Sequence, residues 1–261
     1  MQDAASAMTT PEVANLAAYQ HFYEAVARAQ LAAWLPAGRQ ILVDVSGPRA
    51  ASADLAARAG HTVLRVLDAG PGRPAPRETA AAGPEPGPRA RPRGRIVPLI
   101  ADASRLSFLP DGCADGVIAE DRALSTHLGA EALVADIARV LRPAGRVLAC
   151  VDSLVLGMAA LAGQHRWPHL VDLPHAEVVL VPWPNGMITR CYGPEQAREL
   201  FAGAGLLVNW IRPRTVFSSS MVTHALREDP ASLPRLVRAE LAAASDESLG
   251  AQLVISACKP D

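Results

Sequence analysis

The sequence predicts an α/β fold built on a mostly parallel sheet, and three features between residues 96 and 153 support this class. Two apolar runs, at 96–100 and 116–119, are bounded by Asp, Pro and Gly and are too short to be helices, so we expect buried strands. Apolar residues then recur every three or four positions from Ala130, which indicates a helix with one buried stripe. A third apolar run at 147–151 completes the strand, helix, strand unit that parallel sheets require.

Carboxylates follow each of these expected strands. Asp102 comes after the first run, Glu120 and Asp121 follow the second, and Asp152 follows the third. In open α/β sheets, ligands bind beyond the carboxyl ends of the strands. We therefore expect a binding site where these side chains gather.

The same stretch resembles the centre of a class I S-adenosylmethionine-dependent methyltransferase of the small-molecule type 11 kind. That family typically has an acid-Ala pair after its third strand, then L-P-F-x-D-G-x-x-D, then a helix ending in R-V-L-[RK]-P-G-G. This chain has Asp102-Ala103, a similar run over 106–115, and RVLRPAG at 139–145. The resemblance implies a Rossmann-like sheet of seven strands with helices on both faces, mostly parallel with an antiparallel last strand. It also implies S-adenosylmethionine as the cofactor, with Asp102 and Ala103 near its adenine.

Residues 1–40 are expected to hold one long helix. Thr10 is placed to cap it, Pro11 is tolerated in its first turn, and the helix can run to Trp34. In the family that the chain resembles, N-terminal helices often cover the cofactor cleft, so this segment is a candidate lid. Three of its residues either touch a ligand or pack the helix onto the sheet: Tyr19, His21 and Tyr23.

A strand at 41–45, a helix at 50–59 and a strand at 62–67 form the expected βαβ opening of a nucleotide-binding sheet. The family has D-x-G-x-G-x-G in the first turn, because glycines let the backbone approach the cofactor. Aligned on Asp44, the three glycine positions hold other residues in this chain: Ser46, Pro48 and Ala50. The resemblance implies that Asp44, Ser46 and Gly47 line the cofactor turn, with less space for the methionine part of the cofactor.

The acid that holds the ribose hydroxyls in the family ends the second strand. Here Leu67 takes that position and Asp68 follows one residue later. At a strand end, a turn can compensate for a shift of one residue. Asp68 is therefore retained as a candidate cofactor-binding residue.

Residues 70–95 form a Pro-rich and Arg-rich insertion with seven prolines, five glycines and six arginines against two glutamates. It has almost no apolar side chain beyond alanine, so burial cannot offset the entropy of ordering it. We expect a disordered loop between the second and third strands. A solvated linker is the simplest interpretation, and binding of nucleic acid or of an acidic partner is the alternative.

Residues 120–128 replace a shorter loop of the family that ends in L-E-H-L. The resemblance implies that Glu120, Asp121 and His127 face the cleft. Histidine side chains can accept a proton at neutral pH, so His127 is the candidate general base, whereas a loop histidine without a role is the alternative.

The C-terminal half contains an expected hairpin, because Asn185-Gly186 separates apolar arms at 178–181 and 187–191. The segment 154–193 is expected to be an insertion on the substrate side of the fold. Several of its residues either line a pocket or pack the hairpin: His165, Trp167, His169, His175 and Trp183. A helix from Pro194, a strand at 206–211, a helix from Asp229 and a strand at 253–257 complete the chain.

Composition excludes several classes of protein. The net charge of -1 gives no field that attracts nucleic acid, and the four cysteines and seven histidines show no metal-ligand spacing, so neither a nucleic-acid partner nor a metal is expected. No segment reaches the roughly 18 apolar residues of a membrane span, and no leader precedes the first helix, so we expect a cytoplasmic protein with one domain.

Two functional hypotheses remain from different classes. The first is S-adenosylmethionine-dependent methyl transfer to a small molecule. The second is a catalytically inactive protein with the same fold that serves as a binding or scaffold subunit for a protein partner, which the replaced glycines of the first turn favour. A dinucleotide-binding oxidoreductase would need G-x-G-x-x-G after the first strand, which the residues from Asp44 to Ala50 do not supply.

Overall fold

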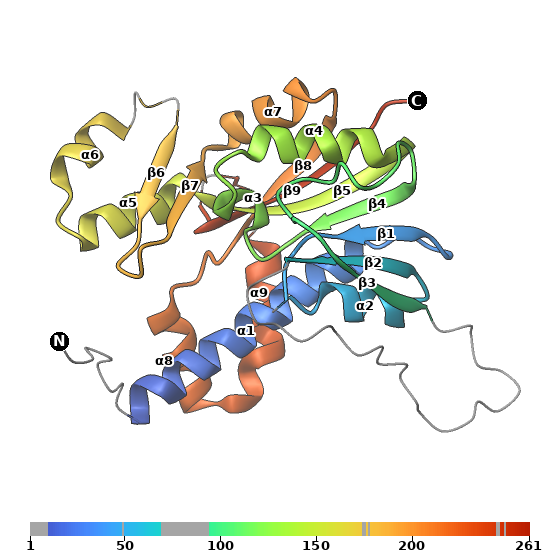
Figure 1. Ribbon diagram of the computed structural model, residues 1–261. Helices are drawn as coiled ribbons and strands as arrows, with labels where there is room; N and C mark the ends of the chain where they lie inside the picture. The colour runs from blue at the N-terminus through green and yellow to red at the C-terminus, as the bar shows by residue number, and fades with distance from the viewer. Residues whose placement is uncertain are drawn as a thin grey trace, which may run out of the picture.

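The computed structural model describes residues 10–48, 50–68, 94–173, 176, 178–243, 246–247 and 249–261. These residues form one mixed sheet with helices on both of its faces (Figure 1). The strands are β1 (Ile41–Asp44), β2 (Thr62–Leu67), β3 (Arg95–Ile100), β4 (Ala114–Ala119), β5 (Leu141–Ser153), β6 (Val179–Pro182), β7 (Ile188–Tyr192), β8 (Leu207–Arg214) and β9 (Gln252–Cys258). The helices are α1 (Thr10–Trp34), α2 (Ser52–Arg58), α3 (Ala123–Thr126), α4 (Ala130–Val140), α5 (Leu154–Gly163), α6 (Trp167–Asp172), α7 (Pro194–Gly203), α8 (Ser219–Glu228) and α9 (Leu233–Ala242).

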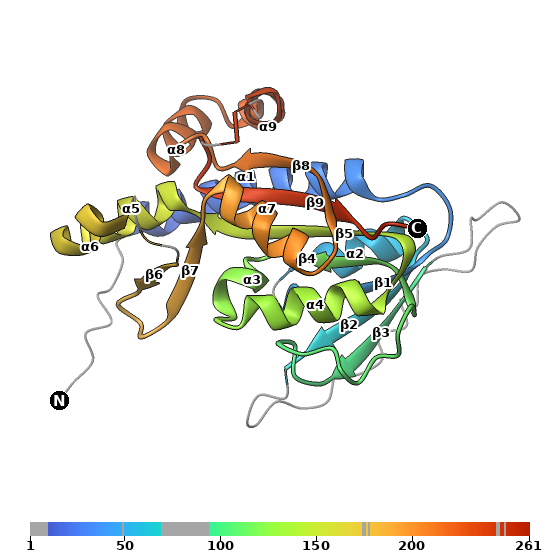
Figure 2. The same ribbon diagram turned by 90° about the horizontal axis from the view of Figure 1, so that it is seen from above.

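The first five strands are parallel and lie in the order β3, β2, β1, β4, β5. β9 runs antiparallel to β5 and to β8, which confirms the expected antiparallel last strand. Figure 2 shows β8 and β9 continuing the layer of β5. The mostly parallel α/β architecture predicted from the sequence is therefore confirmed.

Both faces of the sheet are buried. On β1, Val43 belongs to the core beneath α4 and α7, whereas Leu42 belongs to the core beneath α1 and α2. On β4, Val117 and Ile118 divide in the same way. Strands that are covered on both faces need apolar residues at consecutive positions, which explains the unbroken apolar runs in the sequence.

The expected hairpin adds two strands to the sheet, so the described residues form nine strands where seven were predicted. Asp152 pairs with Cys191 of β7 and with Gln252 of β9 at the same time. β9 pairs with one edge of β5 along most of its length. On the other edge, β4 pairs with β5 as far as Ala149, and β7 pairs with the residues of β5 beyond that point. The hairpin is thereby placed beside the carboxyl end of β4.

Other boundaries differ from the prediction. β5 begins at Leu141, directly after α4, instead of near Val147. α8 was not predicted, and Asp229 caps a short 3-10 turn (Pro230–Ser232) that precedes α9. Most of the 70–95 insertion and His175 lie outside the described residues, and Arg95 already belongs to β3. Within the described part of the chain, no helix is long and apolar enough to cross a membrane.

Candidate functional site

A cavity of about 800 Å³ opens at the carboxyl ends of β1, β2 and β4. One side of α1 forms its wall, with Tyr23 and Arg28 among the lining residues. Seven further residues predicted from the sequence also line it: Ser46, Gly47, Asp68, Ala103, Glu120, Asp121 and His127. Asp44 and Asp102, which were predicted with them, are not among its lining residues.

Asp44 stabilises the turn between β1 and α2 through hydrogen bonds to its side chain. Its carboxylate is buried and accepts hydrogen bonds from the Ser46 amide at 2.8 Å and from the Ser52 hydroxyl at 2.7 Å. Burial raises the pKa of the Asp44 carboxyl, and the bonds from Ser46 and Ser52 partly offset this. The Ser46 hydroxyl in turn accepts a bond from the Glu120 amide at 2.8 Å, so the turn is tied to the end of β4.

Arg65 holds the same turn from the β2 side. Its Nη2 donates to the carbonyl oxygens of Gly47 at 3.2 Å, Pro48 at 3.1 Å and Ala50 at 3.0 Å. The turn is therefore fixed by a carboxylate on its amide side and by a guanidinium on its carbonyl side. Arg65 itself is not among the residues that line the cavity.

The ends of β2 and β3 meet through Asp68, whose Oδ1 accepts a hydrogen bond from the Ala103 amide at 2.9 Å. Because Leu67 is the last residue of β2, Asp68 lies in the following turn and reaches the cavity wall. Asp102 is exposed and accepts bonds from the Ser104 amide at 2.8 Å and hydroxyl at 2.5 Å, which lower its pKa. The Asp102 carboxylate is thus held by its own loop.

Glu120 forms a buried ion pair that the sequence did not predict. Both of its oxygens accept from Arg214 of β8, at 2.7 and 3.0 Å, and the Arg214 side chain is fully buried. The Nε of Arg214 donates to Gln30 of α1 at 2.6 Å, and its guanidinium carbon lies 5.7 Å from the centroid of the Tyr23 ring. Since Glu120 and Tyr23 line the cavity, this network joins the cavity to α1 and β8.

No protein-family profile and no curated protein matches this sequence. The comparison with solved structures is informative. A methyltransferase of Methanosarcina mazei that depends on S-adenosylmethionine is 14% identical, with 88% of this chain and 97% of that chain covered and a TM-score of 0.52. The 1,6-didemethyltoxoflavin-N1-methyltransferase of Burkholderia thailandensis, which holds 1,6-didemethyltoxoflavin and S-adenosylhomocysteine, is 17% identical, with coverages of 100% and 94% and a TM-score of 0.51.

A third match is the complex of the Haloferax volcanii Trm112 methyltransferase activator with its partner, at 15% identity, coverages of 95% and 93% and a TM-score of 0.53. This protein has the class I S-adenosylmethionine-dependent methyltransferase fold. At these identities the likeness establishes the fold alone. The fold that the resemblance of residues 96–153 predicted is therefore confirmed.

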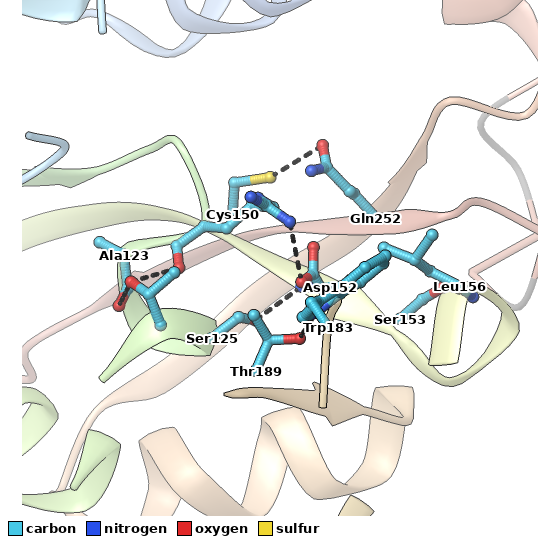
Figure 3. Close-up of polar contacts among 11 residues, drawn as sticks. Ala123, Ser125, Cys150, Asp152, Ser153, Leu156, Trp183, Thr189 and Gln252 are labelled. Carbon is cyan, nitrogen blue, oxygen red and sulfur yellow. Dashed lines mark hydrogen bonds and ion pairs between the residues drawn. The ribbon is translucent and has the colours of Figure 1, made fainter. Parts of the chain in front are cut away.

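A second polar cluster lies at the end of β5 (Figure 3). Arg122 lines the cavity and its Nη1 lies 3.3 Å from Oδ2 of the fully buried Asp152. The backbone of Arg122 has a φ of 61°, in the left-handed region. The Asp152 amide donates to the Ser125 hydroxyl at 2.8 Å, which ties the loop after β4 to the end of β5.

The described pocket candidates of the 154–193 segment do not line the cavity. Trp183 donates from Nε1 to the Thr189 hydroxyl at 2.8 Å across the hairpin. Trp167 is exposed, and its ring centroid lies 5.9 Å from that of His165. The residues that line the cavity do not include Trp183, Trp167, His165 or His169.

The helix α1 also differs in part from its predicted role. Tyr23 lines the cavity, whereas Tyr19 packs with α8 and α9 and His21 is exposed. Sequence reasoning missed Arg65 and Arg214. Each is an arginine within a partly buried strand. A charged side chain in such a position needs a polar partner, but the sequence does not show which residue that partner is.

Proposed function

We propose that this protein is an S-adenosylmethionine-dependent methyltransferase that acts on a small molecule. The observation that carries the proposal is that one cavity gathers the turn after β1, Asp68, Ala103 and Glu120 at the carboxyl ends of parallel strands. Its volume of about 800 Å³ is within the range of cofactor and small-ligand pockets. The Burkholderia thailandensis enzyme, which has the same fold, supports a small molecule as the substrate.

The residues of this cavity fit the cofactor in three places. The Asp68 carboxylate would accept hydrogen bonds from the ribose hydroxyls, Ala103 would border the adenine, and Ser46 and Gly47 would border the methionine part. S-adenosylmethionine would supply an activated methyl group for direct in-line displacement. Tyr23 and the rest of the α1 wall would orient the substrate and exclude water.

His127 is the candidate base of the proposed site. It lines the cavity on the loop after β4, and its imidazole would take the proton of a substrate hydroxyl or amine as the methyl group is transferred. Both oxygens of Glu120 are engaged by Arg214, so Glu120 shapes the cavity instead of accepting that proton.

The second candidate function is a binding or scaffold subunit without catalysis. The observation that favours it is that Ser46, Pro48 and Ala50 occupy the turn where the family has glycines, and Pro48 has no N–H to donate. The Haloferax volcanii complex shows that this fold occurs in assemblies with a protein partner.

Calorimetric titration of the purified protein with S-adenosylmethionine and S-adenosylhomocysteine tests the first proposal. We expect dissociation constants in the micromolar range, on the order of -8 kcal/mol of binding free energy. Binding followed by transfer of labelled methyl groups into a small-molecule extract would support the enzyme. The absence of heat and of any thermal shift at millimolar ligand would reject it in favour of the scaffold.

A further inference from the structure

The guanidinium of Arg65 is aimed at the backbone of the turn between β1 and α2. Arg65 lies opposite Asp44 in the parallel pairing of β1 with β2. From there, its Nη2 reaches three carbonyl oxygens, those of Gly47, Pro48 and Ala50, at 3.0 to 3.2 Å. One side chain therefore donates to three carbonyl groups of this turn. Arg49, which also belongs to the turn, lies outside the described residues.

The composition of the turn also restricts its backbone. Gly47 has a φ of 82°, a conformation that residues with side chains rarely adopt. Pro48 has a fixed φ and no N–H, and Ser46 and Ala50 carry side chains where glycines would allow several conformations. The turn therefore has little freedom to adapt its backbone to a ligand.

The direction of the carbonyl groups matters for the ligand. A carbonyl oxygen carries a partial negative charge, and one that is turned into the cavity would repel a carboxylate. Arg65 keeps three such oxygens pointed towards β2, while the Asp44 carboxylate accepts hydrogen bonds from the Ser46 amide and the Ser52 hydroxyl. Both supports act on the backbone and leave the cavity itself open.

We propose that Arg65 is a positioning residue that fixes this turn, in which the glycines of the family are replaced, in the form that accepts the amino-acid end of the cofactor. This inference rests on the proposed function and concerns only one end of the ligand. The turn determines affinity for the charged methionine part, whereas Asp68 and Ala103 determine affinity for the nucleoside part.

The test compares two ligands on the same protein. S-adenosylhomocysteine carries the amino-acid end, and 5′-methylthioadenosine lacks it. In the Arg65→Met variant we expect the affinity for S-adenosylhomocysteine to fall by about tenfold or more, because the turn loses a charged donor whose two Nη2 hydrogens are shared among three carbonyl oxygens. The affinity for 5′-methylthioadenosine should change less than about threefold, since its part of the cavity is untouched.

Two further variants make the result specific. Arg58→Met removes an exposed arginine from α2 and should leave both affinities unchanged. Arg65→Lys keeps a cationic donor without the planar fork and should recover part of the lost affinity for S-adenosylhomocysteine. If Arg65→Met does not fold, the same selective loss must still appear, to a smaller degree, in Arg65→Lys.

The outcomes separate this inference from the proposed function. Equal losses for the two ligands in a folded Arg65 variant, or no loss for either, would overturn the positioning role while wild-type binding leaves the proposed function standing. A wild-type protein that binds neither ligand would overturn the proposed function, and the inference with it.

Discussion

Arg214 and Glu120 form a buried, two-pronged ion pair, with Nη1–Oε2 at 2.7 Å and Nη2–Oε1 at 3.0 Å. The pair joins the last residue of β8 to the residue that follows β4. Burial disfavours the charged form of Arg214, but the Glu120 carboxylate outweighs it and holds the pKa of the guanidinium above its usual range. A charge in this position depends on its partner.

Removing one member of this pair should therefore be costly. We expect Arg214→Met to lower the free energy of unfolding by about 3 to 5 kcal/mol, because Glu120 is left buried without a counter-charge. Urea unfolding measures this change. The Arg214→Met, Glu120→Gln double variant should recover a large part of it.

Arg212 provides a matched control on the same strand. It is exposed and lies against the Trp210 ring at 4.5 Å, so Arg212→Met should change stability by no more than about 1 kcal/mol. Equal changes in the free energy of unfolding for Arg212→Met and Arg214→Met would show that the buried ion pair does not stabilise the fold more than an exposed arginine does.

Asp68 and Asp102 were both assigned to the cofactor from the sequence, and the structure separates them. Both are exposed, but Asp68 lines the cavity, whereas Asp102 does not and is bonded to Ser104. We expect Asp68→Ala to lower the affinity for S-adenosylhomocysteine about tenfold and Asp102→Ala to lower it less than about threefold. Calorimetry of the two variants checks this, and the reverse ranking would restore Asp102 to the site.

The sequence was most informative where local rules determine structure. Leu42 and Val43 face opposite cores of the sheet, so their strand had to be apolar throughout and was predicted correctly. Of the carboxylates expected to gather beyond the strand ends, Glu120 and Asp121 line the cavity, whereas Asp102 and Asp152 do not. The mostly parallel sheet followed from the apolar runs, whereas Asp68, Ala103 and His127 were expected at the cavity only because of the family resemblance.

The sequence was least informative about long-range polar contacts. Arg214 lies 94 positions after Glu120, and no local pattern relates them. Arg65 stands out in the strand TVLRVL, yet its partners are backbone carbonyl groups, which any residue could provide. Such contacts depend on which strands become neighbours, and therefore become visible only once the sheet is assembled.

Gly186 and Gly163 form a pair of glycines that differ in backbone conformation. Both are exposed, and a Cβ at either would meet no atom within 4 Å, but Gly186 in the hairpin turn has a φ of 81°. We expect Gly186→Ala to lower the free energy of unfolding by about 1 kcal/mol, and Gly163→Ala, at the end of α5, to leave it unchanged or raise it by up to about 1 kcal/mol. Equal effects in urea unfolding would show that the turn does not require the left-handed conformation.

Asp152 gives the protein a pH-dependent stability of defined sign. Its side chain is fully buried, and Oδ1 accepts no hydrogen bond of good geometry from the described residues. Burial raises the pKa of this carboxyl, although Arg122, Gln252 and Thr189 partly offset the increase. The folded state therefore holds a proton at pH values where the unfolded state, with an aspartate pKa of about 3.9, has released it.

The stability of the wild-type protein should consequently lose this contribution as pH rises from about 3.9 towards the raised pKa of Asp152. Asn cannot titrate, so the stability of Asp152→Asn relative to wild type should increase over the same window. Asp102→Asn is the control of opposite sign, since the pKa of Asp102 is lowered and its contribution is lost as pH falls. Urea unfolding between about pH 2 and pH 7 measures both differences, because the contribution of Asp102 is lost mainly below about pH 3.9. Parallel curves for Asp152→Asn and wild type would mean that the pKa of Asp152 is not raised in the fold.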